Sequence, residues 1–194
     1  HRGVRPPERQ NDGDSHPMTR EYPDDVAGPY EAPPYEFEDR EGRLIEVQRY
    51  NGGIEPLFEM YRAFDPEDRA QGIPPTNEDQ IRTWLETLMD ANALNVIGWH
   101  GEDPIGHAML VPDDEESFEL AIFVLGEYQN AGIGTGLIEG LLGAGREDGV
   151  ERVWLSVERW NKAATALYRK VGFRPTDNGS FELEMSARLT PDSE

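Results

Sequence analysis

The chain has 194 residues, and its 39 acidic and 18 basic residues give a formal net charge of −21 at pH 7. This charge argues against binding to nucleic acids or anionic lipids, because proteins that bind them carry a basic surface. The sequence contains no apolar run of about 18 residues that could span a membrane. Cysteine is absent, which excludes disulfides and thiolate catalysis.

The acidic residues are spread along the whole chain, and Lys162 and Lys170 are its only lysines. This pattern is typical of a protein from a salt-loving organism. At molar salt the Debye length is about 3 Å, so repulsion between the acidic side chains is screened. An ordinary acidic protein is the alternative interpretation. The polar, proline-rich first residues do not form a secretory signal, so we expect a cytoplasmic protein.

Residues 1–40 are predicted to form a flexible arm, because they are rich in proline and poor in aliphatic side chains. Met18 could be the natural start, which would make residues 1–17 foreign to the native protein. An arm that docks on a neighbouring subunit is the alternative. We expect one folded domain over residues 41–190.

The spacing of apolar side chains in this domain predicts alternating strands and helices. In chain order, we expect a strand over 43–50, helices over 54–64 and 76–94, strands over 95–100, 104–111 and 117–125, a helix over 132–147, a strand over 151–157, a helix over 161–171, and one or two strands within 180–189. Thr76 is predicted to cap the second helix. Strands that interleave with helices in this way indicate an α/β fold, with helices on both faces of a mixed sheet.

The turn after the strand over 117–125 reads QNAGIGTG, with glycines at 132, 134 and 136. Glycine inside a helix costs about 0.5–1 kcal/mol relative to alanine, so something should offset this cost. The unpaired N–H groups at a helix N-terminus bind anions without a basic side chain, and glycine lets a phosphate approach the backbone. Close packing of the helix start on the sheet is the alternative explanation.

The spacing of these glycines excludes two common phosphate-binding motifs. Neither Gly132 nor Gly134 begins a G-x-G-x-x-G dinucleotide motif, and no lysine follows the last glycine as it would in a P-loop. The pattern that remains is Gln129-x-x-Gly132-x-Gly134, directly after a strand.

Two segments resemble signatures of the GNAT acetyltransferase superfamily. FELAIFV at 118–124, with QNAGIG at 129–134, is similar to the acetyl-CoA-binding core of that family. NKAATALYRKVGF at 161–173 resembles the second signature, N-x-x-A-x-x-L-Y-x-x-x-G-F. The resemblance covers about residues 118–173. It implies the GNAT fold, in which a mostly antiparallel sheet splays apart between its fourth and fifth strands.

The resemblance also implies that acetyl-CoA is the cofactor and that the glycine turn holds its diphosphate through backbone N–H groups. Gln129 would order the loop or reach a phosphate, and Thr135 could add a hydroxyl. Backbone groups of the fourth strand would hold the pantetheine arm, which enters the splayed sheet like an added strand. Asn161 is expected to cap its helix and to contact the cofactor. The cofactor-binding residues implied are Ile122, Phe123, Val124, Gln129, Asn130, Ala131, Gly132, Ile133, Gly134, Thr135, Asn161, Ala164 and Tyr168.

Tyr168 is the candidate general acid, because the matching tyrosine of the family points at the thioester sulfur. Pure packing in the core is the alternative. Glu119 occupies the position of the general base in the histone-acetyltransferase branch of the family, and a solvated strand glutamate is the alternative. His107 is a second candidate base. No metal site is expected, because His100 and His107 lack a third ligand.

Together these residues predict direct transfer of an acetyl group from acetyl-CoA to a primary amine in a ternary complex. The catalytic residues would be Tyr168 and Glu119. A non-catalytic acyl-CoA-binding module on the same fold is the alternative, and a structural partner domain with an acidic face is a third. The acceptor could be a small molecule or a peptide. The acidic surface would suit a cationic amine, although it would equally serve solvation in salt. A homodimer is an open expectation, because GNAT domains are often dimers.

Overall fold

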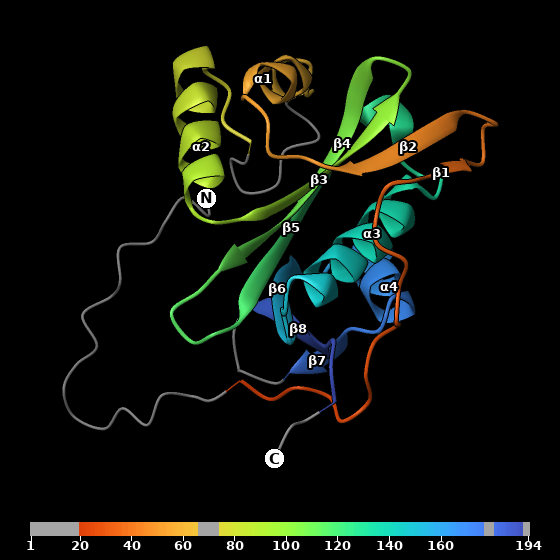
Figure 1. Ribbon diagram of the computed structural model, residues 1–194, viewed down its shortest axis with the longest axis vertical. Coiled ribbons are helices and arrows are strands. Elements are labelled where there is room, and N and C mark those ends of the chain that lie inside the picture. The colour runs from red at the N-terminus through yellow and green to blue at the C-terminus, as the bar shows by residue number, and fades with distance from the viewer. Residues whose placement is uncertain (1–19, 66–73, 177–180, 192–194) are drawn as a thin grey trace.

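The computed structural model describes residues 20–65, 74–176 and 181–191. They form one sheet with helices on both faces (Figure 1). The strands are β1 (Tyr35–Glu38), β2 (Leu44–Arg49), β3 (Leu94–His100), β4 (Asp103–Pro112), β5 (Phe118–Val124), β6 (Arg152–Glu158), β7 (Arg174–Thr176) and β8 (Glu182–Arg188). The helices are α1 (Glu55–Arg62), α2 (Glu78–Asp90), α3 (Ile133–Glu147) and α4 (Lys162–Lys170). The predicted α/β fold is confirmed.

The strands follow the order β1-β2-β3-β4-β5-β6-β8-β7, and among these strands of the described residues β5 and β6 form the one parallel pair. These two strands pair at Phe118 with Val153 and at Glu119 with Trp154. Past these residues both strands continue without pairing to each other, so a gap opens between them. The predicted divergence between the strands over 117–125 and 151–157 is confirmed.

The two faces of the sheet carry separate apolar cores. On one face, α1 and α2 pack with Ile97 of β3 and Phe123 of β5. On the other face, α3 contacts β2 to β5 and buries Leu137, with α4 beside it (Figure 1). Because side chains alternate along a strand, β5 presents Ile122 and Val124 to the side of α3 and Phe123 to the side of α1 and α2. Residues of β5 therefore reach both faces beside the gap.

Residues 20–40 differ from the flexible arm that we expected. β1 pairs with β2, with Tyr35 opposite Val47, and Val26 forms an isolated bridge with Arg188. Between these contacts the segment runs past α4 and α3 (Figure 1). Its aromatic side chains supply the buried surface that aliphatic residues do not; they are Tyr30, Tyr35 and Phe37. Residues 1–19, with the suggested foreign segment over 1–17, lie outside the described residues.

Three glycines on one face of α3 allow this segment to lie directly on the helix. They are Gly136, Gly140 and Gly143. A Cβ atom on Gly143 would lie 2.7 Å from the carbonyl oxygen of Tyr30, and one on Gly140 would lie 2.7 Å from the hydroxyl of Tyr35. Gly136 lies against the ring of Phe37. The expectation that Gly136 and Gly140 bring α3 close to the sheet is confirmed, because Phe37 and Tyr35 lie in the edge strand β1 and Val47, which Gly140 also faces, lies in β2. Gly143 makes room for the part of the N-terminal segment that precedes β1.

The second helix is shorter at both ends than the range 76–94 that we expected. Asn77, not Thr76, is its N-cap, and its side-chain oxygen accepts hydrogen bonds of 2.8 and 3.3 Å from the N–H groups two and three residues on. The helix ends at Asp90, because Asn92 adopts the left-handed conformation with φ 57°. Within the described ranges, no helix combines the length and apolar character needed to cross a membrane.

Candidate functional site

The candidate site lies at the open end of the gap between β5 and β6. Just beyond β5, the N–H of Leu125 donates to the carbonyl of Ile105 in β4 at 3.0 Å. Backbone groups of successive residues point to opposite sides of a strand. Those of Ile122 and Val124 therefore point away from β4 and toward the gap, where the ladder with β6 has ended. They can pair with an extended ligand lying between the two strands.

The turn after β5 leads from this gap to the first turn of α3. It contains the 3₁₀ turn η2 (Gly126–Tyr128) and two residues in the left-handed conformation, Asn130 with φ 60° and Gly132 with φ 86°. The side-chain amide of Gln129 donates to the carbonyl of Val124 at 3.0 Å. Gln129 thus ties the turn to the end of β5, which is the loop-ordering role among the two that we considered.

The backbone N–H groups at the start of α3 make no hydrogen bond to any residue that the structure describes. Gly132 is the N-cap, and no side chain caps the helix. Within the described part of the chain, the N–H groups from Asn130 to Thr135 donate to no backbone carbonyl, whereas that of Gly136 donates to Gly132 at 3.4 Å. A row of free donors at the positive end of a helix attracts an anion. The turn therefore has the geometry expected of a phosphate cradle.

Gly134 joins this turn to the gap and to α4. A Cβ atom on Gly134 would lie 3.3 Å from Leu167 of α4 and 3.9 Å from Ile122 of β5. At the start of α4, the side chain of Asn161 accepts a hydrogen bond from the N–H of Ala164 at 3.1 Å, as expected for its cap. The two sequence motifs thus meet at one place, although they are far apart along the chain.

Tyr168 projects from α4 on the side of α3 and is partly buried. Its ring packs edge-on against Phe173, with the ring centres 6.0 Å apart. Burial raises the pKa of Tyr168 to about 12, so the hydroxyl stays protonated at neutral pH. The hydroxyl makes no hydrogen bond to any residue that the structure describes. The hydroxyl is not among the buried side-chain atoms that lack a partner in the described part of the chain, so a ligand can reach it.

Glu119 lies at the closed end of the gap. It stands opposite Trp154 of β6 and opposite Val111 of β4. Its position along β5 puts it on the face of α1 and α2, whereas Tyr168 packs with the core of α3 and α4. The two candidate catalytic residues therefore flank the sheet from opposite faces. A reaction between them would have to take place within the gap.

His107 is buried in the core and does not fit the role of a base. Its Nε2 donates to the side-chain oxygen of Asn95 at 2.7 Å, and its Nδ1 accepts from the hydroxyl of Tyr61 at 2.6 Å. Burial lowers the pKa of His107 to about 3. An imidazole that is fully buried, neutral and bonded at both nitrogens cannot take a proton from a substrate, so this interpretation was wrong. His100 instead bonds the hydroxyl of Tyr128 at 2.7 Å.

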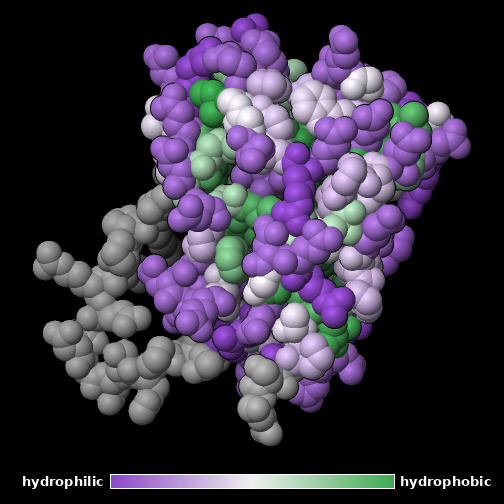
Figure 2. Space-filling view, in the orientation of Figure 1, coloured by the Kyte–Doolittle hydropathy of each residue, from purple (hydrophilic) through white to green (hydrophobic). Residues whose placement is uncertain are grey.

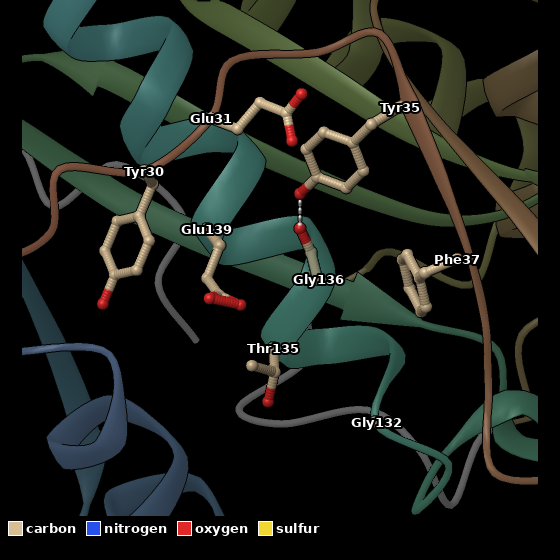
Figure 3. A pocket seen from close by; sticks show the side chains of 8 residues that line it. All are labelled: Tyr30, Glu31, Tyr35, Phe37, Gly132, Thr135, Gly136 and Glu139. Carbon is tan, nitrogen blue, oxygen red and sulfur yellow. Dashed lines mark hydrogen bonds between the residues drawn. The ribbon is translucent and has the colours of Figure 1, made fainter.

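A hollow lies beside the turn, between the N-terminal segment and the first turns of α3 (Figure 3). It is lined by Tyr30, Glu31, Tyr35, Phe37, Gly132, Thr135, Gly136 and Glu139. The hydroxyl of Tyr35 points at the carbonyl of Gly136 and donates a hydrogen bond to it. The carboxylates of Glu31 and Glu139 would repel a phosphate in this hollow. Gly132 and Thr135 belong to both the turn and the hollow, so the N–H groups of the turn that face away from these carboxylates are the candidate anion site.

The hairpin between β1 and β2 also contacts the turn, and sequence reasoning missed it because it fell within the predicted arm. The N–H of Arg40 donates to the carbonyl of Ala131 at 3.0 Å. A signal was present: Tyr35–Glu38 alternates aromatic and acidic residues, and a turn sequence with Gly42 follows before the next strand. That pattern predicts a hairpin, but the high proline content of the segment led us to predict a flexible arm instead.

Much of the surface in the view of Figure 2 is hydrophilic, as expected from the high content of charged residues.

Comparison with solved structures finds similar folds. The GNAT domain of S. lividans PAT has a TM-score of 0.70 at 15% identity, over 80% of this chain and 96% of that one. YncA of Salmonella typhimurium, a putative acetyltransferase solved with acetyl-CoA, has a TM-score of 0.59 at 17% identity, over 77% and 98%. Ribosomal-protein-alanine N-acetyltransferase of Brucella melitensis has a TM-score of 0.60 at 21% identity, over 74% and 99%. At these identities the similarity supports the fold alone.

Sequence comparison is more specific over a shorter range. A stretch of 64 residues is 38% identical to the [ribosomal protein bS18]-alanine N-acetyltransferase of Escherichia coli (strain K12). It spans 33% of this chain and 42% of that enzyme, so less than half of the relative is matched. The sequence pattern of the Acetyltransferase (GNAT) family matches residues 54–173, which include the gap, the amide turn and α4. This chain therefore belongs to the GNAT acetyltransferase family.

Proposed function

We propose that this protein transfers an acetyl group from acetyl-CoA to a primary amine. The observation that carries the proposal is the row of unpaired N–H groups from Asn130 to Thr135 at the open end of the β5–β6 gap. These groups suit the diphosphate of coenzyme A, and the gap beside Ile122 and Val124 suits its pantetheine arm. The similar fold of the Salmonella protein, which was solved with acetyl-CoA, supports this choice of cofactor.

The reaction that we propose is a direct transfer. The nitrogen of a neutral amine attacks the thioester carbonyl carbon, so that a C–N bond forms as the C–S bond breaks. A backbone N–H of β5 polarises the carbonyl oxygen. Glu119 takes the proton of the amine, directly or through a water molecule, and Tyr168 donates toward the leaving sulfur.

The environment of Tyr168 refines its role. Burial raises its pKa to about 12, whereas an ordinary thiol has a pKa of about 8.5. Complete proton transfer from Tyr168 to a free thiolate would therefore be uphill. We expect the hydroxyl to stabilise the departing sulfur mainly as a hydrogen-bond donor, which requires the protonated form that burial maintains.

The acceptor in this proposal is a primary amine of a small molecule or a peptide. The relatives from E. coli and Brucella are named for acetylating a ribosomal protein, but the match to the E. coli enzyme covers too little of its length to transfer that substrate. Two further parts of the proposal are that the protein works in the cytoplasm and that it works at high salt. The acidic, lysine-poor composition supports the second of these. We also propose that the protein forms a homodimer, and its mass in solution tests this.

An assay of thiol release tests the proposed function. The purified protein would be incubated with acetyl-CoA and a panel of primary amines at low and molar KCl, while calorimetry measures acetyl-CoA binding. Release of coenzyme A that depends on an amine supports the enzyme. Binding without release across the panel would favour a non-catalytic acyl-CoA-binding module. Absence of binding under all salt conditions would contradict both.

A further inference from the structure

The hairpin between β1 and β2 is held rigidly by Asp39. This side chain accepts hydrogen bonds from the N–H of Glu41 at 2.9 Å, from the N–H of Arg43 at 2.8 Å and from the guanidinium of Arg43 at 2.7 Å. Burial alone would raise the pKa of Asp39, but these hydrogen bonds outweigh burial and lower it. These three hydrogen bonds close the turn of the hairpin between Asp39 and Arg43.

Two contacts fix this hairpin against the amide turn. The guanidinium of Arg43 lies over the ring of Tyr128, 4.2 Å from its centre, and donates to the carbonyl of Glu127 at 3.1 Å. The main-chain N–H of Arg40 donates to the carbonyl of Ala131 at 3.0 Å. The position of Arg40 relative to the turn is thus set by its own backbone.

The side chain of Arg40 is exposed and reaches the turn. Its Nε lies 3.9 Å from the point where a Cβ atom on Gly132 would stand. It forms no ion pair or hydrogen bond with any residue that the structure describes, although the exposed Glu38 and Glu41 are close to it in sequence. Arg49, by contrast, pairs with Glu147 at 2.9 Å and with Asp148 at 3.0 Å. A guanidinium beside a row of free N–H groups, without a carboxylate partner, is suited to a phosphate.

We propose that Arg40 binds the diphosphate of coenzyme A, so that the N-terminal hairpin completes the cofactor site. This inference rests on the proposed function. The amides of the turn supply partial charges, whereas Arg40 adds a full positive charge in a molecule whose net charge is −21. In molar salt, attraction beyond about 3 Å is screened. At that salt concentration a direct contact between Arg40 and the diphosphate still contributes to binding, whereas long-range attraction of the diphosphate to the protein does not.

The test compares Arg40→Gln with Arg146→Gln in the full chain. Arg146 is also exposed but lies in the last turn of α3, at the far end of the helix from the amide turn. Both substitutions remove one positive charge, and neither removes a main-chain contact. We expect the Kd of coenzyme A, measured by calorimetry, to rise about tenfold in Arg40→Gln and to stay unchanged in Arg146→Gln. Melting temperatures should be the same in both variants and the parent.

A second ligand tests whether Arg40 contacts the diphosphate or the 3′-phosphate of coenzyme A. Dephospho-coenzyme A keeps the diphosphate and lacks the 3′-phosphate, so the tenfold loss should persist with this probe. A loss that disappears with dephospho-coenzyme A would overturn the assignment to the diphosphate. Equal affinity of Arg40→Gln and Arg146→Gln, with coenzyme A bound by the parent, would overturn the role of Arg40 and leave the proposed function standing. A parent protein that does not bind coenzyme A would overturn both.

Discussion

Substitution of Gly132 by alanine tests whether the conformation of the amide turn matters for cofactor binding. Gly132 has φ 86°, and the nearest atom to an added Cβ is the Nε of Arg40 at 3.9 Å. The methyl group therefore meets no clash, and the cost is the left-handed backbone, about 1–2 kcal/mol for an L-residue. For a chain of this length that corresponds to a fall in melting temperature of roughly 2–8 °C. If the backbone rotates to relieve the strain, the N–H groups beside it turn away from the diphosphate.

Gly149→Ala is the matched control, because Gly149 has φ 87° and no atom lies within 4 Å of an added Cβ. It follows α3 and is remote from the turn. Thermal melts should show a similar loss of stability in both variants. Loss of one charge-assisted hydrogen bond costs about 1.5–3 kcal/mol, so calorimetry should show at least a tenfold rise in the Kd of coenzyme A for Gly132→Ala alone. Equal affinity in the two strained variants would refute the role given to the turn.

Three further predictions test other parts of the account. Tyr168→Phe should lower kcat for thiol release about 100-fold without changing the Kd of acetyl-CoA, and an unchanged kcat would contradict its role at the sulfur. Gly143→Ala should destabilise the protein by about 1–3 kcal/mol, because its Cβ would lie 2.7 Å from the carbonyl oxygen of Tyr30; if the N-terminal segment did not cover α3, the better helix propensity of alanine would raise the melting temperature instead. The pKa of His107 is lowered from 6.5 to about 3 by burial. The unfolded chain therefore takes up a proton below pH 6.5 that the folded chain refuses, and stability should fall with pH by about 2 kcal/mol at pH 5. In His107→Gln this part of the pH dependence should vanish, and parallel denaturation profiles for the parent and the variant would argue against it.

The cofactor half of the fold could be predicted from sequence because its constraints are local. The apolar run FELAIFV, bounded by polar turns, indicates a strand, and the glycine turn marks the start of α3. The helical spacing around Tyr168 places it on the side of the core. The helix ends were less accurate, since Asn77 competed with Thr76 for the cap and both are good capping residues.

The N-terminal segment could not be predicted from composition, because its stability depends on a distant surface. Proline and scarce aliphatic residues usually indicate disorder. Here Tyr30, Tyr35 and Phe37 gain their packing from a glycine face of α3 about 100 residues later in the chain. The glycines were visible in the sequence, but nothing in their spacing identified which segment they admit.

The two candidate bases, Glu119 and His107, show that contacts between distant parts of the chain also limit prediction at the site. Strand alternation predicted that Glu119 lies on the face opposite Ile122 and Val124, which the packing of those two residues confirms. The pairing with Trp154, which puts Glu119 at the closed end of the gap, could not be predicted. The same reasoning could not show that His107 would bond both Tyr61 and Asn95, since these partners come from α1 and β3. Burial and partners, not residue type, decide whether a histidine can act as a base.

The central claim is that backbone N–H groups of the turn between β5 and α3 hold the diphosphate of acetyl-CoA, and a crystal structure of the complex tests it most directly. The account predicts diphosphate oxygens at about 3 Å from backbone nitrogens between Asn130 and Thr135, with the pantetheine arm between β5 and β6. A diphosphate bound elsewhere, with this turn vacant, would contradict it.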